Sequence, residues 1–278
     1  MLPEPEPGLN PPPTAAMPFR PDAKLVKEHL RWLAGFHPQH LHNWGNLLDN
    51  DPEAAMCEAA VRRILQRNGN VVQPWESLKG SRRLPDFRCS QEGKVFFVEV
   101  TCISIEKATK VTGVLHKAID PVASGYESLN DAIFDACNKK TPQCSDLEHP
   151  ALVAVCTHHS EASWICLDRL DLEELLTGEE SITLKIDTRT GNPVGDTYIS
   201  TKLRSATFLC PQERGGISHA RYPVSGILIC ACGYYNLEIL GLLHPKPLRP
   251  FDRSMLPKVE FCRLRAGYES GLLSTEWI

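Results

Sequence analysis

Apolar and polar positions follow first a helical and then a strand-like spacing over residues 50–157, and this pattern predicts an α/β fold. A helix is expected over 51–67, because Asp51 can cap its N-terminus and Pro52 fits the first helical position. Gly69 is suited to end this helix, since glycine readily adopts a left-handed backbone conformation. Three strands are expected to follow, at 71–72, 84–89 and 95–103, with a turn at 91–93 between the last two.

A second helix is expected over 126–140, followed by a strand over 151–157 that is apolar throughout, as in strands buried on both faces. The most apolar stretch, 224–243, is interrupted by two tyrosines, Asn236 and Glu238. This interruption favours two strands around a turn over a membrane span. Weaker patterns predict a short helix and further strands, in the ranges 170–176, 182–186, 198–203, 227–232 and 237–243.

The N-terminal segment has a different composition from the rest of the chain. Residues 1–22 hold eight prolines and no apolar period, which predicts a disordered or polyproline-like tail. Residues 23–48 have a helical pattern that Pro38 interrupts. No second linker is apparent, so 23–278 is predicted to be a single domain, with a core at 50–157 and a C-terminal elaboration at 158–278.

Charge and cysteine content limit the possible partners and the cellular compartment. The net charge of −4 gives no global attraction to nucleic acid, so binding to DNA must rest on local charge. Eleven cysteines in a chain of 278 residues, with no signal-peptide pattern before them, indicate a reducing, cytoplasmic compartment. Cys230 and Cys232 have no second cysteine pair at zinc-site spacing, and His158-His159 is interpreted as a loop pair.

Three acidic residues are candidates for metal chemistry. Glu99 lies in the apolar run 96–100, where a buried charge needs compensation, and Asp86 lies at the start of the preceding strand. Mg²⁺ or Mn²⁺ bound by carboxylate oxygens would provide that compensation. Two alternatives remain open for Glu99, an outward orientation or an arginine partner. The third acid is Glu58 on the first helix, whereas Glu53 in its first turn suits the helix dipole.

This ordered set of motifs resembles the PD-(D/E)xK nuclease superfamily, whose fold is called restriction-endonuclease-like. The resemblance rests on the helix with Glu58, the Leu84-Pro85-Asp86-Phe87 segment and the Val98-Glu99-Val100-Thr101 segment, and it covers roughly 50–157. Within the superfamily the pattern is most similar to uncharacterised bacterial proteins. The resemblance implies a mixed central sheet flanked by helices, here with an additional C-terminal β-hairpin. It also implies Asp86 and Glu99 as metal ligands, with Glu58 as an outer ligand.

One position departs from the family pattern. The family places a lysine two residues after the glutamate, and this chain has Thr101 there. Lys140, at the end of the helix over 126–140, is a candidate replacement, because Lys140-Thr141-Pro142-Gln143 resembles a Lys-x-x-Gln feature of such helices. Complementing the helix C-terminus is the alternative role for Lys139 and Lys140. Thr101 itself offers a hydrogen bond in place of a cation.

Basic residues near the expected site favour contact with nucleic acid phosphates. Arg82 and Arg83 directly precede the Pro-Asp motif, and the segment 244–265, which includes Lys246 and Arg249, holds six basic and two acidic residues. A solvated basic surface is the alternative interpretation.

The sequence therefore predicts a Mg²⁺-dependent endonuclease that hydrolyses DNA, with bacterial restriction, defence or repair as its setting. A homodimer would suit two cuts in a duplex, and no membrane partner is expected. One alternative is a catalytically weakened module that binds nucleic acid or a partner protein. Another is an interaction protein whose acidic residues form a buried polar network.

Overall fold

A computed structural model describes residues 19–76, 84–116, 126–165, 168–183, 185–194, 198–203, 206–212, 216–233, 238–267 and 273–278. Most of the predicted tail, together with Arg82 and Arg83, therefore lies outside the described residues.

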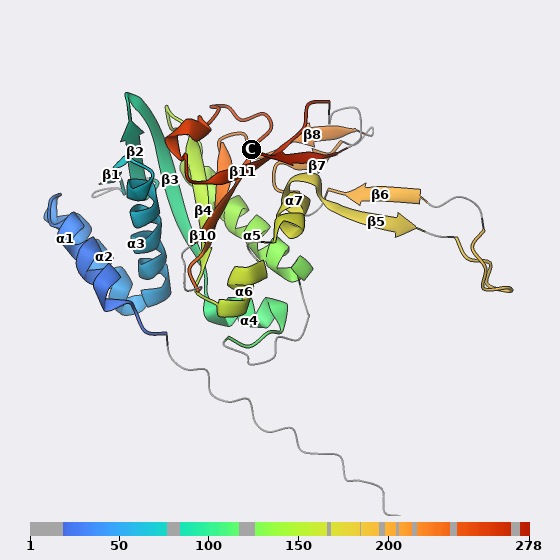
Figure 1. Ribbon diagram of the computed structural model, residues 1–278, viewed down its shortest axis with the longest axis horizontal. Coiled ribbons are helices and arrows are strands. Elements are labelled where there is room, and N and C mark those ends of the chain that lie inside the picture. Colours follow the sequence, from blue (N-terminus) through green and yellow to red (C-terminus); the bar gives the residue numbers. More distant parts are fainter. Residues whose placement is uncertain are drawn as a thin grey trace, which may run out of the picture.

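The centre of the molecule is one mixed sheet of eight strands in the order β1-β2-β3-β4-β9-β10-β11-β12 (Figure 1). β3, β4 and β9 run parallel to one another, and antiparallel partners flank them on both sides. The strands of this sheet are β1 (Val71–Pro74), β2 (Phe87–Gln91), β3 (Lys94–Ile103), β4 (Ala151–Thr157), β9 (Gly226–Ala231), β10 (Glu238–Leu243), β11 (Glu260–Leu264) and β12 (Thr275–Trp277). Two small hairpins stand apart from it, namely β5 (Glu179–Thr183) with β6 (Tyr198–Lys202), and β7 (Leu209–Pro211) with β8 (Ile217–His219).

Helices cover both faces of the sheet (Figure 1). On one face α5 packs with α4 and α7 over a core that includes Ile133, Val153 and Ile227. On the other face α3 covers the sheet, and α1 and α2 cover α3. The helices are α1 (Ala23–Leu33), α2 (Pro38–Asn50), α3 (Pro52–Arg67), α4 (Ile105–Thr112), α5 (Tyr126–Lys140), α6 (Ser160–Ile165) and α7 (Arg169–Thr177), with 3₁₀ turns at Thr141–Cys144 and Arg253–Met255.

The helix α3 is buried on two sides, which explains its many small residues. Cys57, Val61 and Leu65 face the sheet, while Ala55 and Ala59 face α1 and α2. Small side chains let the outer helices approach α3 closely, as in packed helix pairs. The helix positions Glu58 between its two buried faces.

The helix cap and the turn residues agree with the elements expected from the sequence. Asp51 caps α3, its Oδ1 accepting a hydrogen bond from the Ala54 amide at 3.0 Å, and Gly69 follows the helix with φ of 89°. Glu92 and Gly93 join β2 to β3 with φ angles of 51° and 80°. A two-residue loop with both φ positive matches the twist of a hairpin, so it fixes the register of β2 on β3.

Several sequence expectations are confirmed. The helix over 126–140 and the strand over 151–157 have the expected bounds, and all seven residues of β4 are buried. The hairpin expected within 224–243 is present as β9 and β10. It forms part of the main sheet rather than an addition to it, since β9 pairs with β4 and β10 with β11.

Other expectations need correction. β2 begins at Phe87 rather than at residue 84, so Asp86 precedes the strand. Pro38 begins a second helix, in accord with the preference for proline at the first helical position. The elements α4, α6, β7, β8, β11 and β12 had no expected counterpart. No described helix is both long enough and apolar enough to span a membrane.

Candidate active site

Asp86 and Glu99 are brought together by the β2–β3 hairpin. The register pairs Phe87 with Val98, so one residue further along Asp86 comes opposite Glu99. Opposite residues of an antiparallel pair share a face of the sheet. Oδ2 of Asp86 accepts a hydrogen bond from the Val100 amide at 2.6 Å, which anchors the carboxylate beside β3 and leaves Oδ1 as the oxygen suited to a cation.

Lys140 contacts Glu99 from a different element, the helix α5. It is the last residue of α5, and its Nζ donates a hydrogen bond to Oε1 of Glu99 at 2.5 Å. Glu99 is 1% exposed, so the ammonium supplies the compensation that a buried carboxylate requires. This contact corrects the alternatives of an outward-facing Glu99 or an arginine partner. Lys139, one residue earlier, is exposed.

Glu58 joins the same group of charges from α3. Burial, followed by the charges of Asp86, Glu76 and Glu99, raises the pKa of the Glu58 carboxyl well above its usual value. Burial and the Glu99 charge likewise raise the pKa of Asp86. Mutual repulsion among the four acids means that the site is short of positive charge even with Lys140 present.

The pKa of Lys140, the cation in this site, is also raised, although burial acts on it in the opposite direction. Burial alone would lower the pKa of the Lys140 ammonium, but the charges of Glu99, Asp86 and Glu58 outweigh it and raise the pKa. Lys140 therefore remains protonated at neutral pH.

Glu53 has a different function from Glu58. Its Oε2 accepts a hydrogen bond from the Ile105 amide at 2.7 Å and so stabilises the N-terminus of α4. Of the two acids on α3 considered from the sequence, Glu58 is the one in the charged group.

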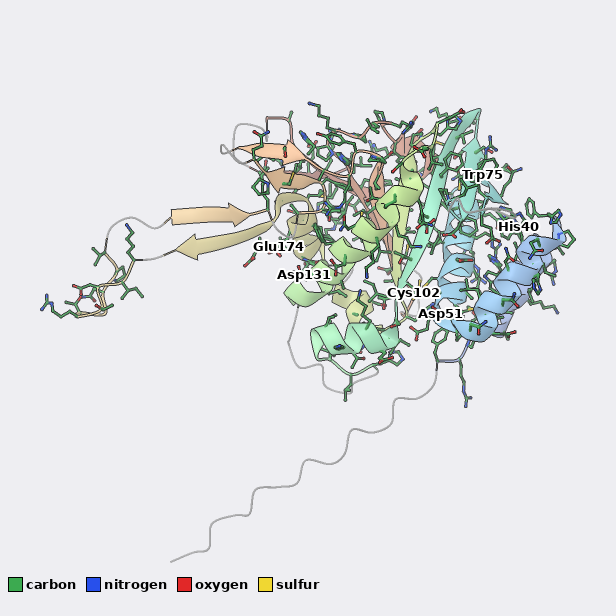
Figure 2. All side chains as sticks on the ribbon, turned by 180° about the vertical axis from the view of Figure 1, so that it is seen from behind. His40, Asp51, Trp75, Cys102, Asp131 and Glu174 are labelled. Atoms are coloured by element: carbon green, nitrogen blue, oxygen red, sulfur yellow. The ribbon has the colours of Figure 1, made fainter. Side chains whose placement is uncertain are left out.

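Glu76 and His40 belong to the site but were not predicted. Glu76, just after β1, shares a hydrogen bond of 3.1 Å with Nδ1 of His40 on α2. Figure 2 labels His40 on the outer helical layer and Trp75 beside the edge of the sheet. Neither residue lies in a motif. They become neighbours in the tertiary structure, where α2 packs on α3 and α3 contacts β1.

A small pocket of about 20 Å³, with room for about one water molecule, lies between the outer helices and the acidic group. Glu58, Glu76 and Asp86 line one side, and Trp32 of α1 and Trp44 of α2 line the other. The aromatic wall limits access to the acidic side chains from this direction, so α1 and α2 are part of the site's architecture.

The remaining predicted residues lie at varied positions. Thr101 is on β3 two residues after Glu99 and therefore on the same face. Lys246 is exposed and Arg249 is half-buried in the loop after β10. β10 is three strand spacings from β3, roughly 14 Å at the usual 4.8 Å per strand, so these two residues do not contact the acidic group.

The donor chemistry of the acidic group fits a hard divalent cation. Mg²⁺ and Mn²⁺ take carboxylate oxygens, and Asp86, Glu99 and Glu58 supply them. The carboxylate oxygens of these residues lie farther apart than the ligand atoms of a formed metal site. Within the part of the chain that the structure describes, the group of three ligating atoms that lie mutually within 4.8 Å consists of cysteine sulfurs, not of these oxygens.

Comparison of the chain with protein-family models, with curated proteins and with solved structures found no match.

Proposed function

We propose that the protein is a Mg²⁺- or Mn²⁺-dependent endonuclease that hydrolyses phosphodiester bonds of DNA and has a restriction-endonuclease-like fold. The observation that carries this proposal is the hydrogen bond from Lys140 Nζ to Glu99 Oε1, beside Asp86. This contact places an ammonium group next to two acids, and the motif itself has Thr101 at the position of the family's lysine. Bacterial restriction, defence or repair remains the proposed setting.

In this proposal each charged residue has a separate task. Asp86 and Glu99 would hold the metal ion, and Glu58 would orient a water molecule bound to it. The bound ion would activate water and neutralise charge on the phosphate oxygens. Lys140 would hold the attacking water by a hydrogen bond and stabilise the charge that develops on the phosphoryl group. The hydroxyl of Thr101 offers a further donor on the same face.

DNA is the proposed partner because basic residues that could contact phosphates precede the acidic motif in the sequence and follow β10 in the fold. Arg82 and Arg83 precede Asp86 in the sequence, and Lys246 and Arg249 lie in the loop after β10, a strand roughly 14 Å from β3. A duplex is wide enough to bridge that separation. A homodimer, which would allow two cuts in one duplex, is likewise a proposal.

A second candidate function is a module that binds nucleic acid or a partner protein without cleaving it. It is favoured by the spacing of the acidic oxygens, which is wider than in a formed metal site, and by the ammonium already placed on Glu99. In this case Lys140 would stabilise the fold in place of a metal ion.

Magnesium-dependent stabilisation separates the two candidates without assuming a substrate. The endonuclease proposal expects Mg²⁺ or Mn²⁺ to raise the melting temperature of the wild type but not of Asp86→Asn, because a ligand that binds only the folded state stabilises it. Glu53→Gln is the matched control, since Glu53 lies on the same helix as Glu58 but caps α4. Equal shifts in wild type and Asp86→Asn, or none in either, would contradict a metal ion at this site.

A further inference from the structure

Five cysteines from four separate segments gather between α3 and the sheet. Cys57 comes from α3, Cys156 from β4 and Cys232 from the residue after β9, and their Sγ atoms all lie within 4.8 Å of one another. Cys102 interacts with Cys57, and Cys230 with Cys156. Figure 2 labels Cys102 near the N-terminal end of α3.

We propose that Cys57, Cys156 and Cys232 form a zinc site, with His158 beside it as the fourth ligand. Zinc in structural sites is tetrahedral with Zn–S bonds of about 2.3 Å, which requires sulfur atoms about 3.8 Å apart. The three sulfurs are already close to this arrangement. Three thiolates also exclude hard cations such as Mg²⁺, so this site is chemically distinct from the acidic group.

His158 is suited to the remaining position. It lies two residues after Cys156, and its Nε2 is buried with no hydrogen-bond partner among the described residues. The His158 backbone lies against Gly233, the residue after Cys232, and its ring nitrogens lie outside the group of atoms within 4.8 Å, so the ring would turn to complete the site. The neighbouring His159 is already engaged, its Nε2 with the Val114 carbonyl and its Nδ1 with the Ala162 amide.

The backbone holds the ligands in place. The Cys232 amide donates a hydrogen bond to the Thr157 carbonyl at 2.9 Å, which ties the end of β9 to the end of β4. Gly233 follows, and a Cβ there would lie 2.5 Å from the His158 carbonyl oxygen, so only glycine allows this close approach. The ligand-bearing segments are therefore preorganised before any metal binds.

Zinc binding at this site would release the protons of the Cys57 and Cys156 thiols to solvent, whereas hydrogen bonds from these two thiols lower the pKa of the Cys232 thiol. Burial raises the pKa of Cys57 and of Cys156, so both are neutral thiols in the absence of a metal. The bound ion would tie α3 to β4 and β9. Because Cys57 precedes Glu58, it would also fix the part of α3 that carries Glu58.

The first experiment measures zinc in the wild-type chain, purified under reducing conditions without chelator. Elemental analysis after gel filtration is expected to give one zinc per chain, and Asp86→Asn is expected to retain it. A chain without zinc that also fails to take up added Zn²⁺, or zinc that is lost in Asp86→Asn, would overturn the proposal. Magnesium-dependent stabilisation is measured separately, so this result does not depend on the endonuclease proposal.

The second experiment uses Co²⁺ as a spectroscopic probe of the metal-free, reduced protein. Tetrahedral thiolate ligation is expected to give intense visible bands and a thiolate charge-transfer band. Cys232→Ser should weaken Co²⁺ binding by at least about 100-fold, since even outer-shell changes cost 10–100-fold. Cys89→Ser is the matched control, because Cys89 is a buried thiol of the same core but outside the cluster. Equal affinity for the wild type and Cys232→Ser would overturn the site.

His158→Ala tests the fourth ligand, and it is expected to shift the visible cobalt bands while the charge-transfer band remains. An unchanged spectrum would remove His158 from the proposal. If Cys232→Ser fails to fold, titration of the wild type with a thiol-specific mercurial replaces it. Release of one zinc as the ligand thiols react is the expected result, and complete reaction of the thiols with no release of zinc would contradict it.

Discussion

The Lys140 ammonium lies 2.5 Å from Oε1 of Glu99, although the two residues are 41 positions apart in the sequence. The fold produces this contact because α5 packs on the face of β3 to which Glu99 points. α5 ends at Lys140, where the 3₁₀ turn with Pro142 begins. A lysine at position 101 of the strand and a lysine at position 140, at the end of α5, can thus contact the same Glu99 carboxylate.

Replacing Glu58 with glutamine is expected to stabilise the metal-free protein at neutral pH. The folded-state pKa of Glu58 is raised above its usual value of 4.5, so the folded state holds its proton at pH values where the unfolded state has released it. Stability is therefore lost as pH rises above about 4.5. Glutamine removes this loss, and we expect a gain of about 1 kcal/mol, or ~2–4 °C in melting temperature. The gain should disappear below pH 4.5, and a constant difference across pH would contradict the assignment.

The stability of the protein should fall on mild acidification because of buried histidines. Burial lowers the pKa of His29 to about 3, while an unfolded histidine titrates near 6.5. The unfolded state therefore gains the proton first, and stability is lost as pH falls from 6.5 towards 3. Between pH 6.5 and 5 the loss from His29 is about 2 kcal/mol.

This prediction is checked by chemical denaturation of His29→Phe, which retains a ring against Trp44. The variant should be less sensitive to pH than the wild type, and the slope that remains should come in part from His244, whose pKa is lowered to about 4. His42→Phe, at an exposed position of α2, is the control and should leave the slope unchanged. Identical slopes in His29→Phe and the wild type would show that His29 is not buried in its neutral form.

Two glycines should respond in opposite directions to alanine. A Cβ at Gly241 would lie 2.2 Å from the Phe261 ring, so Gly241→Ala should destabilise the β10–β11 pair by about 1–3 kcal/mol. Gly45 lies inside α2 with nothing within 4 Å of a Cβ, so Gly45→Ala should stabilise the protein by about 1 kcal/mol. Urea denaturation measures both, and a stable Gly241→Ala would contradict the register of β10 on β11.

A lysine at position 101 should substitute for Lys140. Thr101 lies on the same face of β3 as Glu99, so a lysine there would place its ammonium near the same carboxylate. In the wild type, Thr101→Lys should be neutral or harmful, because a second cation crowds the metal. Combined with Lys140→Met, it should restore part of the DNA cleavage that Lys140→Met removes. Failure of the double variant, with its fold intact, would show that the two positions are not equivalent.

The elements near the site could largely be predicted from the sequence because their signals are local. Asp51 and Pro52 mark the start of α3, and the β2–β3 turn has a glycine at a positive φ. Register then follows from the turn, which is why Asp86 and Glu99 are neighbours as expected. The resemblance to Lys-x-x-Gln helices predicts Lys140 as a candidate. Its contact with Glu99 depends on the tertiary packing of α5 on β3.

The other parts of the site have no local signal. Glu76 and His40 become neighbours only when α2 packs on α3. The three clustered thiols are dispersed over 57–232, so the sequence shows no zinc-site spacing near Cys232. The strands β11 and β12 are short, and the pairing of their neighbours in the sheet stabilises them more than their own propensity does.

The most direct test of the account is DNA cleavage in the presence of Mg²⁺ or Mn²⁺, with DNA binding measured in parallel. It compares the wild type with Lys140→Met, Lys139→Met and Asp86→Asn. We predict cleavage by the wild type and Lys139→Met. Loss of cleavage is predicted for Lys140→Met and Asp86→Asn, with nearly unchanged DNA affinity for Lys140→Met, because one phosphate contact among several is lost. Wild-type protein that binds DNA but cleaves neither single-stranded nor duplex DNA with either metal would contradict the endonuclease and favour the binding module. Cleavage that survives Lys140→Met but not Asp86→Asn would contradict the role of Lys140.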